Sequence, residues 1–255
     1  MGKLRAATVM TVLALPASGA LSAERLRVFA AASLTEAFRE VAAVHERVHP
    51  GRTVELNFAG SQVLRTQIEQ GAPGDVFASA DLVHADALRR AMLLRSCEVF
   101  ARNALVVVVP AGEARVKGLA DLARPGTKLV VAGPAVPAGR YTAEVLARLG
   151  AAGLYGDDFP VRVQANIVSQ EASVRVVLAK VALGEADAGF VYRSDAAAEK
   201  EKTRTIEIPE RDNVVAEYAI GVLRRSHAPQ EAQAFVDLVL GAEGQAILRA
   251  HGFAR

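Results

Sequence analysis

The segment from Leu26 to Phe38 places a strand directly before a helix, with only small residues between the two. Leu26, Val28 and Phe29 form a short apolar strand, and a 3.6-residue apolar repeat begins at Ser33. The first turn of a helix leaves backbone N–H groups without partners at the positive end of the helix dipole. Small residues leave room for a ligand to reach those groups, so the segment predicts an anion-binding site.

A second interpretation of the same segment is purely structural. Ser33 and Glu36 match the capping-box pattern S-x-x-E, in which the two side chains only stabilise the first turn of the helix. The segment by itself does not decide between a cap and an anion site. The recurrence of the same arrangement further along the chain favours the anion site.

Similar junctions follow at regular intervals. A strand over Thr53–Phe58 runs through Ala59-Gly60 into a helix that begins near Ser61, and a strand over Asp75–Ala80 runs into a helix that Asp81 can cap. A strand over 128–132 leads through the loop 134–139 into the next helix. Strands that alternate with helices in this way predict an α/β fold with doubly wound, mostly parallel sheets.

The second half of the chain continues the same pattern. The stretch 169–173 leads into a helix that Gly184 ends, and a strand over Ala188–Tyr192 follows. Residues 199–213 carry mixed charges and are expected to be a solvated surface segment. A strand over Ala216–Leu223 and closing helices over 229–240 and 243–251 complete the chain.

The N-terminus has the features of a secretory signal peptide. Lys3 and Arg5 precede an apolar run over 6–15 that is too short to span a bilayer, and small residues occupy 17–23. We therefore expect residues 1–23 to be a signal peptide, cleaved after Ala20 or Ala23. Removing its two basic residues takes the formal charge from +2 to 0, so the charge balance gives no indication of nucleic-acid binding.

Cysteine usage adds to this expectation. Cys97 is the only cysteine, so an intramolecular disulfide is impossible and a lipid anchor on a cysteine after the leader is excluded. Between Ser96 and Glu98, this thiol is expected to be buried or incidental rather than a nucleophile. We expect a soluble, unanchored monomer in the periplasm.

A zinc-protease motif is present but poorly supported. His45 to His49 reads H-E-x-x-H, which can place two imidazoles on one helix face beside a carboxylate base. Pro50-Gly51 breaks the helix directly afterwards, and helical spacing puts His45 on the packed face with Phe38 and Val41. We expect two packing histidines at a helix end and no bound metal ion. A serine hydrolase is not supported either, because the chain has no G-x-S-x-G.

The ordered set of motifs resembles the periplasmic molybdate-binding proteins of ABC importers, which are type II periplasmic binding proteins. The segments that carry the resemblance cover nearly all of the chain after the leader: 30–38, 58–61, 67–81, 136–141, 173–175, 189–196 and 251–253. The resemblance implies two α/β lobes with a ligand cleft between them. It divides the chain into lobe 1 (24–104), lobe 2 with hinge strands (105–223) and a return to lobe 1 (224–255).

The resemblance also implies a ligand and the residues that bind it. Molybdate, and also tungstate, would be held with high affinity and delivered to the permease of an ABC importer, with no cofactor and no catalysis. The binding groups would be the hydroxyls and N–H groups of Ser33 and Ser61, the N–H groups of Ala138 and Val174, and the hydroxyl of Tyr192. Departures from the family pattern lie at the rim: Gly60, Gln62 and Arg140.

Physical reasoning agrees with this set of neutral groups. A desolvated dianion needs several hydrogen-bond donors, whereas a buried lysine or arginine beside it would make release slow and selection coarse. The converging ends of helices supply the field, and their spacing limits the size of the anion.

Two alternatives remain open from the sequence. The first is a receptor for another tetrahedral oxyanion such as sulfate. The second is an enzyme on the same two-lobe scaffold, which would need titratable groups converging on the cleft. Only Tyr192 among the five motif residues is titratable, so the enzyme is the weaker alternative.

Overall fold

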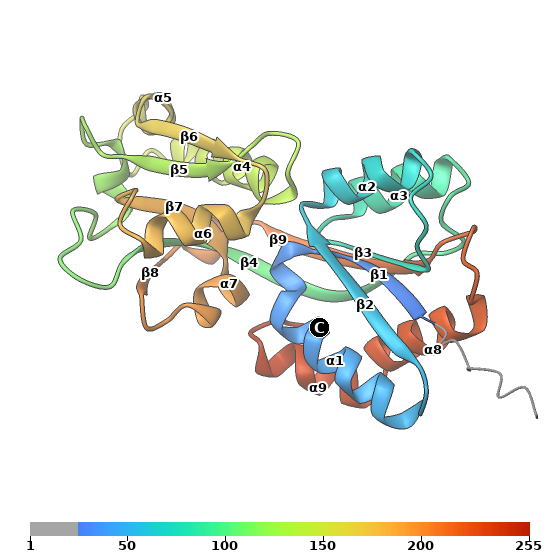
Figure 1. The fold of residues 1–255 in the computed structure, drawn as a ribbon. Helices are drawn as coiled ribbons and strands as arrows, with labels where there is room; N and C mark the ends of the chain where they lie inside the picture. The colour runs from blue at the N-terminus through green and yellow to red at the C-terminus, as the bar shows by residue number, and fades with distance from the viewer. Residues whose placement is uncertain (1–24) are drawn as a thin grey trace, which may run out of the picture.

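The computed structural model describes residues 25–255, and the predicted signal peptide lies outside them. The chain forms two lobes, each a β-sheet with helices on its faces (Figure 1). One lobe contains β1 (Arg25–Ala31), β2 (Thr53–Ala59), β3 (Val76–Ser79), α1 (Thr35–Val48), α2 (Ser61–Glu69), α3 (Leu82–Arg90), α8 (Pro229–Leu240) and α9 (Ala242–Ala250). The other contains β5 (Leu129–Ala132), β6 (Ile167–Glu171), β7 (Ala188–Tyr192), β8 (Thr203–Glu207), α4 (Pro137–Ala151), α5 (Phe159–Ala165), α6 (Val174–Ala182) and α7 (Arg193–Ala198).

The strands follow the order β2-β1-β3-β9-β4-β7-β5-β6, and β8 pairs with β4 at the side of this path. Within the first lobe β1 is parallel to β2 and β3, and within the second β5 is parallel to β6 and β7. The antiparallel pairings all involve β4 (Glu98–Pro110) or β9 (Val215–Val222). Each lobe therefore contains three mutually parallel strands, as the alternation of strands and helices predicts, and the pairings made by β4 and β9 are antiparallel.

Two long strands run between the lobes. Residues Glu98–Ala104 of β4 pair with β9, whereas Leu105–Val108 pair with β7. The second half of β9 lies between β4 and β3. Ala219 and Ile220 pair with Val99 and Glu98 of β4, and Ala219–Val222 pair with Ser79–Val76 of β3. The boundary expected at residue 105 lies at the change of partner in β4, and the movement of the two lobes as units stays a prediction.

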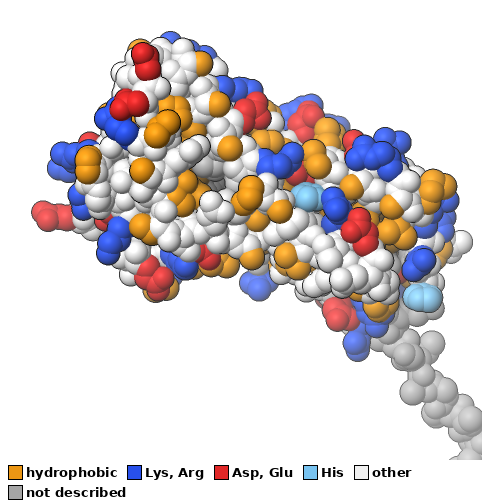
Figure 2. Space-filling model, turned by 90° about the horizontal axis from the view of Figure 1, so that it is seen from above, with side chains coloured by type: hydrophobic (Ala, Val, Ile, Leu, Met, Phe, Trp, Pro, Cys, Tyr) orange, Lys and Arg blue, Asp and Glu red, His pale blue; other side chains and the backbone are white. Residues whose placement is uncertain are grey.

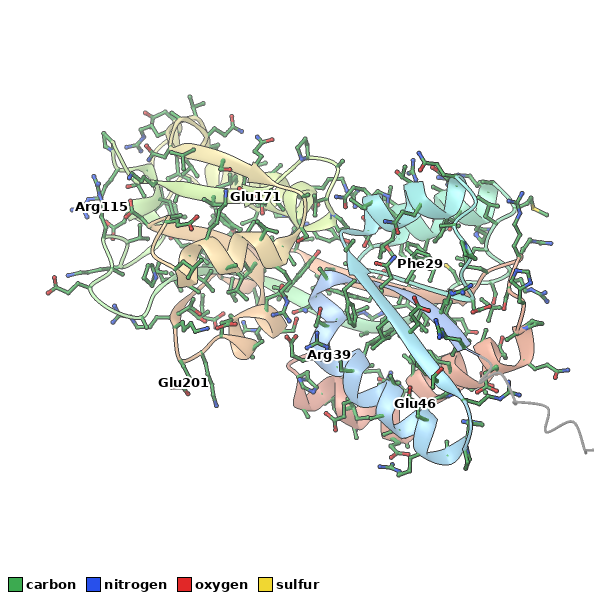
Figure 3. All side chains as sticks on the ribbon, in the orientation of Figure 1. Phe29, Arg39, Glu46, Arg115, Glu171 and Glu201 are labelled. Atoms are coloured by element: carbon green, nitrogen blue, oxygen red, sulfur yellow. The ribbon has the colours of Figure 1, made fainter. Side chains whose placement is uncertain are left out.

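The sheet of the first lobe has an apolar layer on each of its two faces. Phe38 of α1 is fully buried, with ring centroids 5.9 Å from Phe100 and 5.9 Å from Phe235. On the opposite face Phe29 points toward α2 and α3 (Figure 3), where it packs in a cluster with Leu64 and Leu88. A sheet buried on both faces fixes the strand ends in space, and these ends carry the site.

Two strands were not predicted from the sequence: β6 (Ile167–Glu171), of which only the end was expected to lead into a helix, and β8. Residues 199–213 were expected to be a solvated surface segment, but Thr203–Glu207 form β8, which pairs with Val106–Pro110. Within the described chain β8 pairs with β4, and most of its residues are exposed, so it has no alternation of apolar and polar residues. Mixed charge was a correct sign of exposure but a wrong sign of irregular structure.

Arg115 projects from the end of the second lobe farthest from the first, and Glu201 projects outward near α7 and β8 (Figure 3). Within residues 25–255, no helix combines the length and the apolar character that crossing a membrane would require.

Candidate functional site

The junctions between strands and helices meet at one small cavity between the lobes. All five residues predicted from the sequence line it. The lining residues are Ala31, Ala32, Ser33, Gly60, Ser61, Ala80, Val136, Pro137, Ala138, Ser173, Val174 and Tyr192. Residues from 31 to 192 in the sequence are thus brought together at the carboxyl ends of parallel strands, where ligands bind in α/β folds.

Ser33 lies in a short 3-10 turn (Ala32–Leu34) between β1 and α1. Its hydroxyl lies 2.9 Å from the hydroxyl of Tyr218 on β9, and it makes no capping hydrogen bond to α1. Glu36 is bonded instead to Arg175 of the second lobe. The capping-box interpretation of this pair is therefore wrong, because both side chains have partners elsewhere.

Ser61 is the first residue of α2 and is buried. Its Oγ accepts a hydrogen bond from the backbone N–H of Ala80 at 3.0 Å. A hydroxyl that accepts in this way keeps its own proton for a second bond. Ser61 is therefore held in place by the chain after β3, with a donor left for the cavity.

Tyr192, the last residue of β7, is 1% exposed. Its hydroxyl has no hydrogen-bond partner within the described part of the chain. Burial raises the pKa of this phenol well above its ordinary value, so the group stays protonated and can only be satisfied by donating or by accepting within the cavity. A buried polar group without a partner costs free energy, and a ligand that accepts its hydrogen bond would remove that cost.

Ala138 and Val174 bring backbone groups from the second lobe. Ala138 lies in the first turn of α4 after Pro137, and Val174 begins α6 after Ser173. N–H groups in the first turn of a helix have no carbonyl partner within that helix. Gly139 lets α4 start close to β5, because a Cβ at this position would lie 2.1 Å from the carbonyl oxygen of Gly133.

The cavity carries no charge of its own. Among the described residues, those that line it include no Lys, Arg, His, Asp or Glu. Arg175 of the second lobe is engaged by Glu36 and lies 2.9 Å from the buried Asp195, whose pKa burial raises to about 6 despite that arginine. On the face seen from above, charged side chains of both signs are scattered over the two lobes (Figure 2).

Three further hydrogen bonds join the lobes, in addition to the contact between Glu36 and Arg175. Gln62 Nε2 donates to the carbonyl oxygen of Ala172 at 2.8 Å, and Arg140 Nη2 donates to the buried carboxylate of Asp81 at 2.5 Å. The ring of His84 contacts the carbonyl oxygen of Ala135 at 3.1 Å, and burial lowers the pKa of His84. We call two of these hydrogen bonds, Gln62 with Ala172 and Arg140 with Asp81, the rim contacts.

The rim contacts explain the residues at which the sequence departs from the family pattern. Gly60 allows the lobes to approach, because a Cβ there would lie 2.5 Å from the carbonyl oxygen of Ala172. Asp81 caps α3 as the sequence predicts, accepting from the N–H of His84 at 2.9 Å, and also binds Arg140. The second role could not be predicted, since the two residues are 59 positions apart in separate lobes.

Tyr218 is a further residue that the sequence did not assign to the site. It lies in β9, which was assigned only to a hinge strand, and it supports Ser33 from behind. Its ring is fully buried and lies 5.6 Å, centroid to centroid, from that of Tyr192. Nothing in the local pattern distinguishes it from an ordinary buried tyrosine.

Comparison with known proteins agrees with this geometry. Residues 26–254 match the family model described as bacterial extracellular solute-binding protein. The chain belongs to this family. Membership of a solute-binding family sets aside the enzyme alternative. The α/β fold and the resemblance to molybdate-binding proteins are confirmed by the individual relatives and structures that follow.

Individual relatives are similar over nearly the whole chain. The molybdate-binding protein ModA of Mycobacterium tuberculosis is 41% identical over 242 residues, which are 94% of this chain and 88% of that protein. The substrate-binding domain of a putative molybdenum ABC transporter from Clostridium difficile has a TM-score of 0.67 and 31% identity, covering 91% of this chain and 98% of that one. The periplasmic molybdate-binding protein of Azotobacter vinelandii shares the fold with a TM-score of 0.78, 24% identity and coverage of 90% and 99%.

The rim contacts generate a testable prediction about closure. Arg140→Ala leaves the buried Asp81 without its arginine partner in the closed form, at a cost of about 1 to 3 kcal/mol, whereas opening exposes that carboxylate to water. We expect the radius of gyration from small-angle scattering to rise in this variant.

The matched control is Arg89→Ala, which removes an exposed ion pair with Asp86 on α3 and should leave the scattering profile unchanged. A profile for Arg140→Ala that matches the unmodified protein would show that this pair does not hold the lobes together.

Proposed function

We propose that this chain is an exported receptor that captures molybdate, and also tungstate, and delivers it to the permease of an ABC importer. The observation that carries the proposal is the buried Tyr192 hydroxyl, which has no partner in the described chain; Tyr192 lines the uncharged cavity together with Ser33 and Ser61. The molybdate-binding names of the relatives support the choice of oxyanion.

Binding would follow from the arrangement of neutral donors. The hydroxyls of Ser33, Ser61 and Tyr192, with the N–H groups at the starts of α2, α4 and α6, come from both lobes and approach the cavity from different directions. Hydrogen bonds to a charged acceptor are about twice as strong as neutral ones, and a tetrahedral dianion offers four oxygens to accept them. Helix N-termini add favourable potential without a buried counter-charge.

Closure of the lobes would complete the site. Ser33 and Ser61 belong to one lobe, and Ala138, Val174 and Tyr192 belong to the other, so neither lobe surrounds the anion alone. The rim contacts join the lobes outside the anion rather than touching it. An anion held in this way is released when the lobes separate, which suits transfer to a permease.

Sulfate is the second candidate, since it has the same charge and shape and the same donors would satisfy it. Selection between these anions depends on the size of the closed cavity. We place the receptor in the periplasm as a monomer, with residues 1–23 removed on export.

The first prediction from this proposal concerns ligand choice. A ligand that binds only the folded state at one hundred times its dissociation constant stabilises that state by about 2.7 kcal/mol, which raises the melting temperature of a chain of this size by about 5 to 10 °C. We expect molybdate and tungstate to produce such a rise and phosphate to produce none. A rise with sulfate alone would select the second candidate, and no rise with any of the four would contradict the proposal.

The second prediction concerns the residues that bind. Ser33→Ala, Ser61→Ala and Tyr192→Phe should each weaken molybdate binding by about 1.5 to 3 kcal/mol, or roughly tenfold to a hundredfold, because each removes a hydrogen bond to a charged group in a closed cavity. Isothermal titration calorimetry of the folded variants gives the affinity separately from any loss of stability.

Two matched variants serve as controls. Val174→Ala keeps the backbone N–H and should bind almost normally. Ser194→Ala removes a buried serine hydroxyl that binds Asn103 outside the cavity lining, so it should change stability but not affinity. Unchanged affinity in both Ser33→Ala and Ser61→Ala would show that the proposal assigns the anion to the wrong end of these helices.

A further inference from the structure

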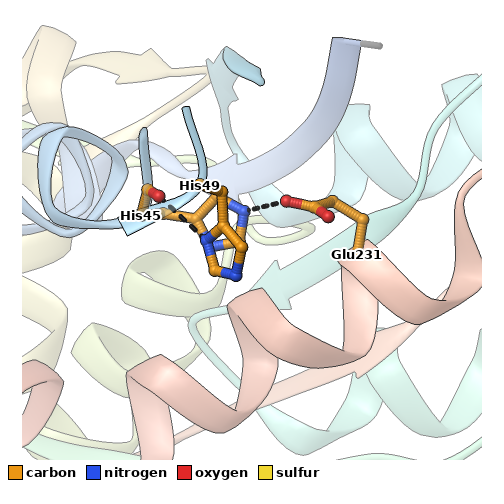
Figure 4. A group of neighbouring side chains, drawn as sticks. All are labelled: His45, His49 and Glu231. Carbon is orange, nitrogen blue, oxygen red and sulfur yellow. Dashed lines mark hydrogen bonds and ion pairs between the residues drawn. The ribbon is translucent and has the colours of Figure 1, made fainter. Parts of the chain in front are cut away.

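A cluster of His45, His49 and Glu231 lies in the first lobe, where the end of α1 meets α8 (Figure 4). One possible ligand atom from each of the three lies within 4.8 Å of the other two. None of the three lines the oxyanion cavity. Two imidazoles and one carboxylate form a donor set that Zn²⁺ and related late transition-metal ions prefer.

The orientation of His49 suits ligation. Its Nδ1 lies 2.9 Å from the carbonyl oxygen of His45, and a carbonyl can only accept, so Nδ1 carries the proton. Nε2 then has a free lone pair. A ring held by Nδ1–H donation to a backbone carbonyl is the usual arrangement of a histidine that binds metal through Nε2.

His45 and Glu231 already meet. His45 is fully buried, and its Nε2 lies 2.5 Å from Oε1 of Glu231. The Nε2 proton occupies the place that a metal ion would take, and metal binding to histidine displaces such a proton. Two ligands of one tetrahedral zinc ion lie about 3.3 Å apart, as follows from bond lengths near 2.0 to 2.1 Å, so small side-chain movements would bring all three atoms into range.

Two arginines near the cluster interact with other carboxylate oxygens. Arg52 lies 3.8 Å from Oε2 of Glu231, so the arginine and the imidazole face different oxygens of the carboxylate. Arg47 is paired with Glu243 at 3.0 Å.

The glutamate of the H-E-x-x-H motif is not a base at this site. Oε1 of Glu46 accepts the backbone N–H of Val54 at 2.7 Å, so this carboxylate connects α1 to β2. The third ligand instead comes from Glu231, 186 residues after His45. The arrangement supports binding of a metal ion and not hydrolysis.

We propose that His45, His49 and Glu231 form a binding site for a late transition-metal ion such as Zn²⁺, separate from the oxyanion cavity. The bound ion would connect α1 to α8, and so the beginning of the first lobe to the segment that returns to it. Its effect would be on the stability of that lobe. His45 is buried, as the sequence predicted for a packing histidine. The structure adds Glu231, which is not part of the H-E-x-x-H motif, as a possible third ligand.

The test uses the untagged mature protein titrated with Zn²⁺ in calorimetry, with Mg²⁺ as the comparison ion. We expect one equivalent of Zn²⁺ to bind and to raise the melting temperature, and Mg²⁺ to do neither. His49→Ala and Glu231→Gln should each weaken Zn²⁺ binding at least tenfold. His251→Ala is the matched control, because this histidine pairs with Glu40 on the same lobe outside the cluster and should leave Zn²⁺ binding unchanged.

His49 is only partly buried, so its removal should leave the fold intact. Binding of molybdate should be the same in His49→Ala as in the unmodified protein, which separates this proposal from the function of the cavity. Absence of Zn²⁺ binding, or binding that His49→Ala and Glu231→Gln leave unchanged, would overturn the proposal.

Discussion

The site depends on a geometric property of parallel strands: their carboxyl ends, and the helix starts that follow them, lie along one edge of the sheet. β4 and β9 connect two such sheets, and the strand ends of both sheets lie at the cavity between the lobes. Ser33 and Ser61 thereby face Ala138, Val174 and Tyr192 across a small cavity. Without the two long strands, the donors of the two lobes would not face each other across one cavity.

Distribution of charge is the second constraint. The arginines nearest to the cavity are bound to carboxylates, Arg175 to Glu36 and Asp195, and Arg140 to Asp81. The cavity is therefore left with hydroxyls and backbone N–H groups, whose hydrogen-bond strength depends on distance and direction. Such a lining favours an anion of one size over others of equal charge, whereas an uncompensated arginine would attract any of them.

The sequence predicted the alternation of strands and helices, because apolar periodicity and small residues at helix starts are local properties. It also selected five residues that the fold brings to one cavity, although their role in binding stays a prediction. It did not reveal β8, whose exposed edge position removes the apolar alternation, or the pairing of Arg140 with Asp81 and of His45 with Glu231. Those contacts join distant segments, so no local pattern encodes them.

At Gly60 the backbones of the two lobes lie close together. A Cβ at this position would lie only 2.5 Å from the carbonyl oxygen of Ala172, which is closer than two such atoms can approach. The absence of a side chain therefore sets how near the two lobes can come to each other. With a larger residue here, the same donors would converge around a wider space, so this one position would change which oxyanion fits.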